Sequence, residues 1–502
     1  MTDAIKNRFN LIDEPWIPIV DVGKVNLKQV FSHAEYRALG GNPVQKIALT
    51  KLLLAIAQSA CTPEDDDDWA ALGSDGLAQK CQEYLDRWHD RFYLYGDKPF
   101  LQIPDIKVAA VQNFGAVLAE ISTGNTTVLT QSQVEKNLSD ADKSLLIVQL
   151  MGFGLGGKKT DNSVVLSPGY QGKFNDKGKP STGKPSASIG FLGFLHNFLQ
   201  GKSLVETLWI NLFTQEKISS LGIYPQGMGA APWQQMPTGE SCVIAEALKS
   251  SLMGRLVPLS RFCLLAENGL HYSEGIAHSG YKEGVIDPSV SVDFSAKGPK
   301  AIWADPEKRP WRLLTALLSF FSQASNKGFD CYQLRLNMGR AIRQMPTIGI
   351  WSGGLRVSSN AGEQYVSGSD DFVESVIQLE SGLLGELWFA NLQLEMDELD
   401  KLSKIVYSAT LHYFKNQNME CKEQAAQASN LFWQLCERQF RGLLGACNDA
   451  EKARAMRSIF AQFVHKAYNS YCPNDTARQL DAWAKNQPNL GQYLRNPNKE
   501  VA

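Results

Sequence analysis

The sequence predicts an α+β protein, with a large mixed domain over residues 1–375 followed by a C-terminal four-helix bundle over residues 376–502. Past Asp370, apolar residues recur every three or four positions in four successive stretches, which is the pattern of packed amphipathic helices. Before Asp370, short apolar runs alternate with Pro- and Gly-rich turns, which is typical of short strands mixed with helices. With 502 residues, 44% of them hydrophobic, the chain has enough apolar material for more than one core.

Local patterns predict the individual elements of the mixed domain. Pro15 and Pro18 interrupt the first strand, and because proline cannot donate to a ladder this strand is expected at a sheet edge. In chain order, the predicted elements are a strand over 9–20, its hairpin partner over 24–28, a helix over 44–60, an acidic helix start over 63–68, and helices over 77–93, 189–200 and 309–321, with a strand element over 255–265.

Composition excludes several classes of protein. The formal net charge of −2 gives no global basic field, so a nucleic-acid site would have to be a local patch. The nine cysteines contain no Cys-x-x-Cys pair, so neither a zinc ribbon nor a redox pair is predicted. The N-terminus lacks the apolar core of a signal peptide, and the run Ile47–Ala60 contains Lys51 and is too short to span a bilayer. We therefore predict a cytoplasmic protein with no membrane partner.

No arrangement of residues predicts catalysis. The sequence shows no Ser-His-Asp, Cys-His or paired-carboxylate pattern, and His271 and His278 lack metal-ligand spacing. The acidic run Asp65–Asp68 is interpreted as a helix start, where carboxylates are favourable, rather than as a metal site. The prediction is a protein without catalytic residues, metal or cofactor.

The segment between residues 150 and 190 has a local excess of positive charge. It holds six lysines against two aspartates, a net charge of +4, and many glycines. Glycine and lysine together allow the backbone to approach phosphates or a groove floor closely. The same composition also fits a solvated surface loop, so both interpretations stay open here.

Part of this segment also resembles a phosphate-binding loop. Gly152–Lys159 follows an apolar, strand-like run and nearly matches Gly-x-x-x-x-Gly-Lys-[Ser/Thr]. The last position is Lys159, and Thr160 comes one place too late for its hydroxyl to hold magnesium. A nucleotide-dependent enzyme is therefore kept as an alternative, which predicts that Lys158→Ala abolishes ATP binding.

The stretch Ile350–Gly362 lies where the mixed region gives way to the helical one. Gly353-Gly354 and Gly362 bracket a short polar tip, and paired glycines indicate a sharp reversal or a close approach of backbone to a ligand. The tip residues are small and rich in donors and acceptors, so they could enter a nucleic-acid groove or separate base pairs. A surface hairpin at a domain junction is the alternative.

Four motifs together resemble one known family. They are Asn10-Leu-Ile-Asp-Glu-Pro-Trp-Ile-Pro-Ile19, Phe92-Tyr-Leu-Tyr with Lys98-Pro-Phe-Leu-Gln102, Pro168-Gly-Tyr-Gln-Gly-Lys-Phe174 and Ser352-Gly-Gly-Leu-Arg356. Their order, their spacing and the helical C-terminus resemble the large subunit of the type I-E CRISPR Cascade complex, the CasA family, across essentially the whole chain. Some members carry zinc-type cysteine pairs, which this chain lacks.

The resemblance implies a non-enzymatic subunit that reads a short motif (the PAM) beside a double-stranded DNA target through the minor groove and starts strand separation. The implied PAM-reading residues are Gly169, Gly172 and Lys173 of the glycine loop, with Lys282. The implied wedge, which inserts beside the first target pair, is Val357, Ser358, Ser359, Asn360 and Ala361; the family often carries a glutamine there. The implied guide-RNA or handle-contact loop contains Asn125, Thr126, Val128 and Leu129, where the family has an aromatic residue.

The resemblance also implies partners. These are the guide CRISPR RNA, the double-stranded target DNA, the backbone, small and handle-binding subunits of Cascade, and the helicase-nuclease effector. A structural scaffold that binds RNA and protein without reading DNA remains a further alternative. It predicts that replacing Gly169 and Gly172 leaves target binding intact.

Overall fold

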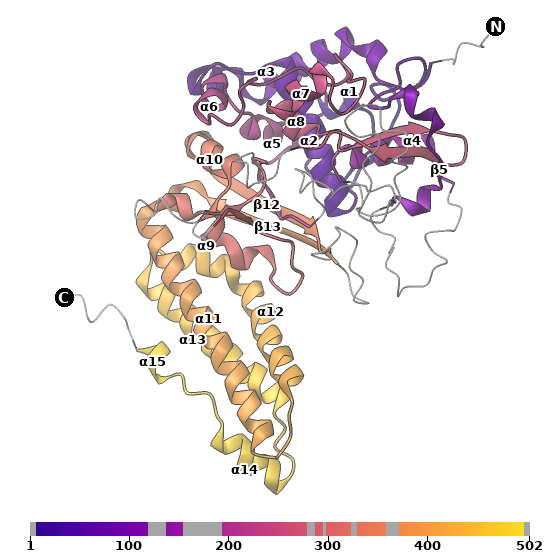
Figure 1. Ribbon diagram of the computed structural model, residues 1–502. Helices are drawn as coiled ribbons and strands as arrows, with labels where there is room; N and C mark the ends of the chain where they lie inside the picture. Colours follow the sequence, from indigo (N-terminus) through magenta and orange to yellow (C-terminus); the bar gives the residue numbers. More distant parts are fainter. Residues whose placement is uncertain are drawn as a thin grey trace. The chain divides into compact units, whose positions relative to one another are not determined.

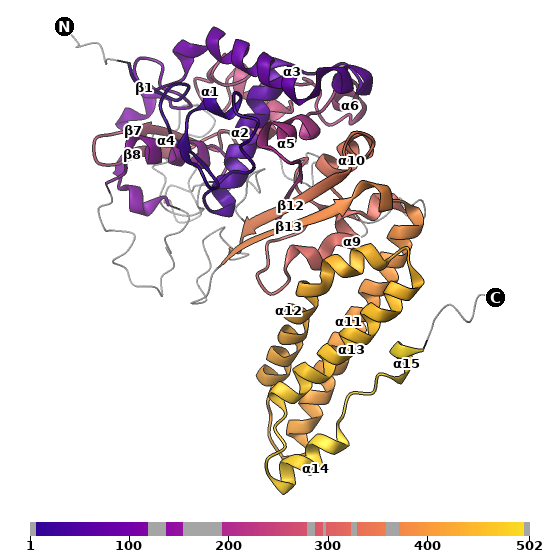
Figure 2. The same ribbon diagram turned by 180° about the vertical axis from the view of Figure 1, so that it is seen from behind.

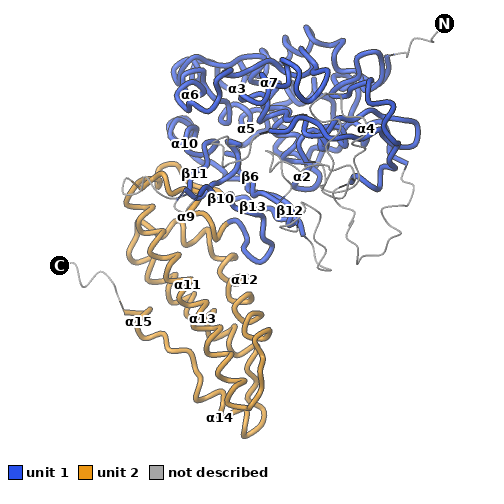
Figure 3. The backbone as a smooth tube through the Cα atoms, in the orientation of Figure 1, with its two compact units in different colours: residues 1–310, 327–376 blue, residues 311–326, 377–502 orange. Residues whose placement is uncertain are grey.

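The computed structural model describes residues 7–118, 137–153, 193–278, 287–294, 298–322, 329–357 and 371–495. The chain divides into two compact units (Figure 3): unit 1 comprises residues 1–310 and 327–376, and unit 2 comprises residues 311–326 and 377–502. The sequence places segment 311–326 in the first domain, whereas in the structure its described residues, 311–322, group with the C-terminal helices.

Unit 1 mixes helices with short strands (Figures 1 and 2). Its helices are α1 (Leu27–Val30), α2 (Pro43–Ala60), α3 (Asp66–Arg87), α4 (Asp140–Leu150), α5 (Leu204–Asn211), α6 (Gln215–Ser220), α7 (Val243–Lys249), α8 (Met253–Leu256) and α10 (Tyr332–Gln344). Its strands are β1 (Arg8–Asn10), β2 (Ile17–Ile19), β3 (Gly23–Val25), β4 (Tyr93–Tyr95), β5 (Val111–Gln112), β6 (His196–Gln200), β7 (Arg261–Leu265), β8 (Leu270–Glu274), β9 (Val292–Asp293), β10 (Lys300–Ala301), β11 (Phe329–Asp330), β12 (Thr347–Leu355) and the first part of β13 (Phe372–Glu380), whose residues from 377 on belong to unit 2. Short 3₁₀ turns are η1 (His89–Arg91), η2 (Pro104–Val108) and η3 (Phe114–Ala116).

Helix α2 is the central element of unit 1, and its prediction over 44–60 is confirmed. Asn42 caps it by accepting a hydrogen bond from the Gln45 amide, the Gln45 side-chain oxygen accepts from the Asn42 amide in return, and Pro43 occupies the first turn. The helix is apolar on nearly all sides because it packs against α3, α4, α5, α8 and strand β12. A helix that is buried all round belongs to the core of a large domain.

The N-terminal signature is part of the structural core. The Asn10 side chain accepts a hydrogen bond from the Ile12 amide at 2.9 Å, and the Trp16 indole donates to the Leu11 carbonyl at 2.9 Å. Strands β2 and β3 form the predicted antiparallel hairpin, in which Ile17 pairs with Val25. The contacts of Asn10 and Trp16 therefore serve folding, and neither side chain is a free surface ligand.

The sheets of the described residues are small, with two or three strands each. The longest strands lie in the sheet with order β13-β12-β6, where Ile350 pairs with Leu199 and Gly353 pairs with His196. The predicted helix over 189–200 is wrong for its described part, since His196–Gln200 is strand β6. Four of its five residues are buried and the strand pairs with β12, so the tertiary partner overrides the helical appearance of the apolar run.

Unit 2 is built from helices, as predicted. They are α9 (Leu314–Leu317), α11 (Glu386–Lys415), α12 (Lys422–Ala446), α13 (Ala450–Tyr471), α14 (Ala477–Lys485) and α15 (Gly491–Leu494), with 3₁₀ turns η6 (Pro310–Leu313), η7 (Ser319–Phe321) and η8 (Ser381–Leu383). The three long helices α11, α12 and α13 run side by side in both views (Figures 1 and 2). Helix α14 closes one end of them, where the Tyr468 hydroxyl donates to the Trp483 carbonyl at 3.0 Å.

Segment 309–321 forms short helical turns rather than the single helix predicted from its apolar run. Trp311 explains its place in unit 2, because its ring lies 4.6 Å from that of Phe440 and 5.7 Å from that of Trp433. The Arg312 guanidinium lies over the Trp433 ring at 3.9 Å. Among the helices in the described part of the chain, none is long and apolar enough to cross a membrane.

Candidate nucleic-acid interface

Most residues predicted to contact nucleic acid lie outside the described part of the chain. These are Asn125, Thr126, Val128 and Leu129, then Gly169, Gly172 and Lys173, then Lys282, and finally Ser358, Ser359, Asn360 and Ala361. Val357 is described, and so are the residues on either side of each segment. We call these flanking residues the stems, because they are the described residues at which each segment begins and ends.

The stem of the wedge segment 358–370 is held by a paired arginine. The Arg356 guanidinium donates to Asp371 Oδ1 at 2.6 and 3.0 Å, and the Arg356 amide donates to the Asp371 carbonyl at 2.9 Å. The Asp371 side chain is 4% exposed, so this ion pair is mostly shielded from water. Arg356 therefore closes the base of the wedge segment and is committed to the protein.

The paired glycines before the wedge serve close packing and not a reversal. Gly353 and Gly354 lie within strand β12, which continues to Leu355. A Cβ at Gly354 would come within 2.6 Å of the Phe194 carbonyl oxygen and 2.9 Å of the Ala304 side chain. The prediction of a turn at these glycines is wrong, because what lies close to their backbone is the neighbouring part of unit 1.

The stem of the glycine-loop segment 154–192 adjoins the wedge stem. Gly193, the first described residue after the segment, has room for no side chain, because a Cβ there would lie 2.6 Å from Val357 Cγ2 and 2.5 Å from the Trp303 ring. Val357 is 7% exposed, so its side chain lies in the base of the wedge. At the other end of the segment, the Phe153 ring meets the His196 ring edge-on at 5.5 Å.

The stem of segment 279–286, which contains Lys282, begins at His278 and ends at Asp287. Both side chains are buried within a polar network beneath strand β6. His278 Nδ1 faces the Arg255 guanidinium at 3.5 Å, so its Nε2 carries the proton and donates to the Pro258 carbonyl at 2.6 Å. Lys51 Nζ donates to the Arg255 carbonyl at 3.0 Å and also to Asp287, which links the two ends of the segment.

Asp287 in turn reaches the glycine-loop stem. Its Oδ1 accepts from the Ser289 hydroxyl at 2.7 Å, and the Ser289 oxygen can then accept from His196 Nδ1 at 2.9 Å. This set has the residue types of a hydrolase triad, but the serine proton points to the aspartate and all three residues are at most 1% exposed. It is a structural network.

Burial sets the charge states of this network. Burial lowers the pKa of His196 and of His278 to about 3, so both imidazoles are neutral. Burial also lowers the pKa of Lys51, partly offset by the carboxylate of Asp287. Burial alone would raise the pKa of Asp287, but the Lys51 ammonium beside it holds that pKa below its usual value. Lys51 and Asp287 therefore form a buried ion pair.

Segment 119–136, which the sequence predicts to contact the guide RNA, has a stem of its own. Before it, Asn113 caps the turn η3, and after it, Ser139 caps helix α4. The Lys143 ammonium of α4 lies 5.6 Å from the centre of the Phe114 ring of η3, so the two ends pack together. Within unit 1, α4 also contacts α2 and β7.

Helix α4 also bears on the nucleotide-binding alternative. The apolar run Leu145–Met151 was interpreted as strand-like, and it forms α4 and its C-cap. The prediction of a strand here is therefore wrong. Because a phosphate-binding loop of this kind follows a strand, the helix also counts against a nucleotide site at Gly152–Lys159. Gly152 and Phe153 are buried against unit 1, and residues 154–159 lie outside the described part.

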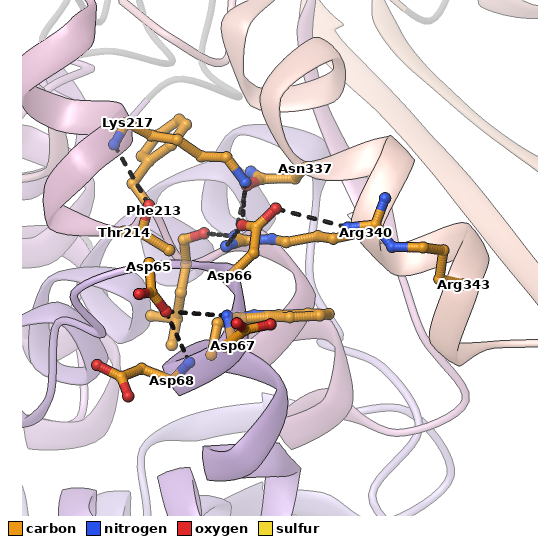
Figure 4. A network of polar contacts seen from close by, with 12 residues as sticks. Asp65, Asp66, Asp67, Asp68, Phe213, Thr214, Lys217, Asn337, Arg340 and Arg343 are labelled. Carbon is orange, nitrogen blue, oxygen red and sulfur yellow. Dashed lines mark hydrogen bonds and ion pairs between the residues drawn. The ribbon is translucent and has the colours of Figure 1, made fainter.

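The acidic run at the start of α3 caps this helix and links it by ion pairs to α6 and α10 (Figure 4). Asp65 caps the helix by accepting from the amides of Asp67 and Asp68 at 2.9 Å, as the sequence predicts. Asp66 pairs with Lys217, with Arg340 at 3.2 Å and with Arg343 at 3.6 Å. The Arg340 guanidinium also lies over the Trp69 ring at 4.4 Å, and that ring is stacked on Trp209 at 4.2 Å.

These contacts place the stems of three predicted DNA-contacting segments around one sheet. Strand β12 leads to the wedge, strand β6 follows the glycine loop, and Asp287 and Val290 flank β6 beside the end of segment 279–286. The sequence analysis missed the buried network that joins them. Its one visible signal was Lys51, the single charged residue within the apolar run Ile47–Ala60 of α2. Among the described residues, no three or more His, Cys, Asp or Glu side chains lie so that they could hold a metal ion together.

Comparison with known proteins identifies the family. The family described as CRISPR-associated protein Cse1 matches residues 10–470, which is most of the chain. The chain belongs to the Cse1 family. Proteins of this family, also called CasA, are the large subunit of the Cascade complex, so the resemblance seen in the sequence motifs is confirmed.

Individual relatives agree with this assignment. CRISPR-associated protein CasA/Cse1 of Thermus thermophilus is 28% identical over 345 residues, which are 62% of this chain and 60% of that protein. The crystal structure of Thermobifida fusca Cse1 matches with a TM-score of 0.74 and 19% identity, over 97% of this chain and 98% of that one. A chain of a CRISPR RNA-guided surveillance complex matches with a TM-score of 0.67 and 14% identity, over 96% and 99%. At these identities the two structures establish a shared fold.

Proposed function

We propose that this chain reads the PAM of a double-stranded DNA target for a type I-E surveillance complex and starts strand separation there. The observation that carries the proposal is the convergence of three stems on the β6–β12 sheet. Segments 154–192, 279–286 and 358–370 hold the predicted glycine loop, Lys282 and the wedge. Their stems are joined by the Gly193–Val357 contact and by the chain of hydrogen bonds from His278 to His196.

Elementary energetics supports a non-catalytic mechanism for this step. The minor groove separates A·T from G·C better than it separates their orientations, so a minor-groove reader should accept several motifs. Opening the first base step costs a few kcal/mol, which a small inserted loop can offset by its own contacts. Later steps exchange DNA pairs for guide-RNA pairs of similar stability, so the protein has only to begin the opening.

The charge of the chain fits this role. The whole chain has a net charge of −2, whereas residues 150–190 carry +4, so phosphate attraction is concentrated on the segment that holds Gly169, Gly172 and Lys173. The wider proposal is that the chain works in the cytoplasm with the guide RNA, the other Cascade subunits and the helicase-nuclease. The segment around Asn125 to Leu129 would contact the guide RNA or its handle.

The deciding experiment is a duplex-binding assay at fixed salt with the assembled complex and a library of randomised motifs. Replacing Gly169 and Gly172 by alanine should weaken binding to preferred motifs by at least tenfold, whereas Gly445→Ala, at an open position in the helical unit, should leave it unchanged. Lys282→Ala should reduce discrimination between motifs, with Lys308→Ala as its surface control. Intact target binding in the double glycine variant would instead establish the scaffold alternative.

The wedge is tested separately. Deleting residues 358–361 should slow opening of a closed duplex and spare a target that already contains an unpaired bubble beside the motif. Equal loss on both targets would mean that the deletion disturbs assembly, and no loss on either would refute a wedge at these residues.

A further inference from the structure

Unit 2 carries a groove that its own packing does not explain. The groove measures about 480 Å³ and lies between the first half of α11, the turn from α12 to α13, and α15. Three leucines on its walls are largely exposed: Leu387 by 71%, Leu394 by 61% and Leu494 by 53%. Single exposed leucines are common on protein surfaces, whereas several gathered on one concave surface offer apolar area that a partner can cover.

The leucines of α11 form a second apolar row on that helix. Its core row contains Trp388 and Leu392, which are at most 2% exposed. Leu387 and Leu394 are seven residues apart, so they lie on one line along the helix, beside this core row. Between them, Asn391 donates to the Cys447 carbonyl at 2.7 Å, which fixes the turn that forms the opposite wall. This hydrogen bond therefore joins two walls of the groove.

The polar residues of the groove favour a negatively charged ligand. The two carboxylates of its lining are each paired: Glu395 accepts from the Arg457 guanidinium at 2.6 to 3.1 Å, and Asp449 pairs with Lys452 at 3.0 Å. Arg454 and Arg495 are exposed on the rim, and among the described residues neither side chain has an ion pair or hydrogen bond. Two uncommitted cations thus flank the three leucines.

We propose that this groove binds an acidic amphipathic helix of another protein. Leucines spaced along a helix, with carboxylates beside them, match both the apolar walls and the two arginines, as in other helix-in-groove complexes. A nucleic acid would satisfy the arginines but would leave the leucines in contact with phosphates and water. The proposal concerns unit 2 alone and does not depend on how unit 1 reads DNA.

The test uses the full-length chain and a fluorescein-labelled designed peptide of about five helical turns. The peptide has leucines at i, i+4 and i+7 and glutamates at the flanking positions. Anisotropy should show saturable binding, and Leu394→Glu should weaken it by about tenfold or more. Leu480→Glu, which alters a 49% exposed leucine outside the groove, should not. Arg454→Glu should weaken the acidic peptide and improve binding of a version with lysine in place of glutamate.

Several outcomes would overturn the proposal. Equal binding of a sequence-scrambled peptide, or no effect of Leu394→Glu, would show that the groove does not select a helix. Competition by single-stranded DNA that Arg454→Glu abolishes would assign the groove to nucleic acid. Concentration-dependent dimers that Leu394→Glu disrupts would assign it to a second copy. A tenfold gain in peptide affinity after removal of residues 496–502 would assign it to the chain's own C-terminus.

Discussion

Replacing Asp287 by asparagine should destabilise unit 1 strongly, although the two side chains have nearly the same shape. The side chains of Lys51 and Asp287 are 2% and 0% exposed, and no water can replace the lost carboxylate. Asparagine keeps one oxygen for the two hydrogen bonds from Ser289 but offers an amide, or at best a neutral oxygen, to the Lys51 ammonium. Breaking a buried ion pair by removing one partner costs about 3–5 kcal/mol, because the other charge stays buried.

The measurement is the free energy of unfolding from urea titrations at pH 7, compared at equal m-values. Asp481→Asn is the matched control, since its ion pair with Lys485 is 2.7 Å long and both side chains are 63% exposed. An exposed pair of this kind contributes about 0–1 kcal/mol. Similar small losses in both variants would refute the assignment of Lys51 and Asp287 as a buried, coupled pair.

A double-mutant cycle then isolates the pair. Lys51→Met removes the ammonium and leaves the carboxylate buried, so it should also cost several kcal/mol. Combined with Asp287→Asn, it should cost clearly less than the sum of the single variants, because neither buried charge then remains. The sign of the pH dependence follows from the lowered pKa of Asp287: its contribution is present at pH 7 and is lost as the pH falls below the usual carboxyl range through the folded-state pKa.

Three further predictions concern the same region. Between pH 6.5 and about 3, the histidines of the unfolded chain bind protons that buried His196 and His278 do not, so the free energy of unfolding should decrease as the pH is lowered. At pH 5.5 the expected loss is about 1.4 kcal/mol per histidine. Urea midpoints measure this loss, and His278→Gln should remove about half of it. Gly354→Ala should cost about 1–3 kcal/mol because its Cβ would press on the Phe194 carbonyl, whereas Gly445→Ala should not destabilise; equal melting temperatures would contradict the packing argument. Because a helix precedes Gly152, ATP with magnesium should leave the melting temperature unchanged in the wild type and in Lys158→Ala, and an ATP-dependent rise that Lys158→Ala removes would revive the nucleotide-binding alternative.

The parts of the fold that the sequence predicted are those governed by local patterns. Helix α2 has an apolar run, an N-cap and a proline in its first turn, and the bundle helices have regular periodicity. Strand β6 was predicted as helix because its five residues carry no local sign of their partner, which lies about 150 residues later. The glycines at 353 and 354 indicated a close approach, but the approaching group is the chain's own Phe194 carbonyl.

The stems could not be predicted for a related reason. Lys51 was visible as a charge within an apolar helix, but its partner is 236 residues away, and no pattern in either segment links the two. The segments proposed to contact DNA were selected from composition and family resemblance. Their common origin at one sheet required the three-dimensional structure.

The buried network has a cost that stability alone does not justify, since well-packed apolar residues could replace a buried ion pair without loss. Contacts between apolar side chains have no preferred direction, whereas hydrogen bonds fix the orientation of the groups that they join. Asn197 on β6 accepts from Ser352 on β12 at 2.6 Å and donates to Ser291 at 3.2 Å, so side-chain hydrogen bonds fix β6 against both of its neighbours. A slip of one residue would turn the side chains of β6 to the opposite faces of the sheet and would break both of these hydrogen bonds. We infer that the network sets the relative register of the three stems, and through it the starting positions of the segments proposed to contact DNA.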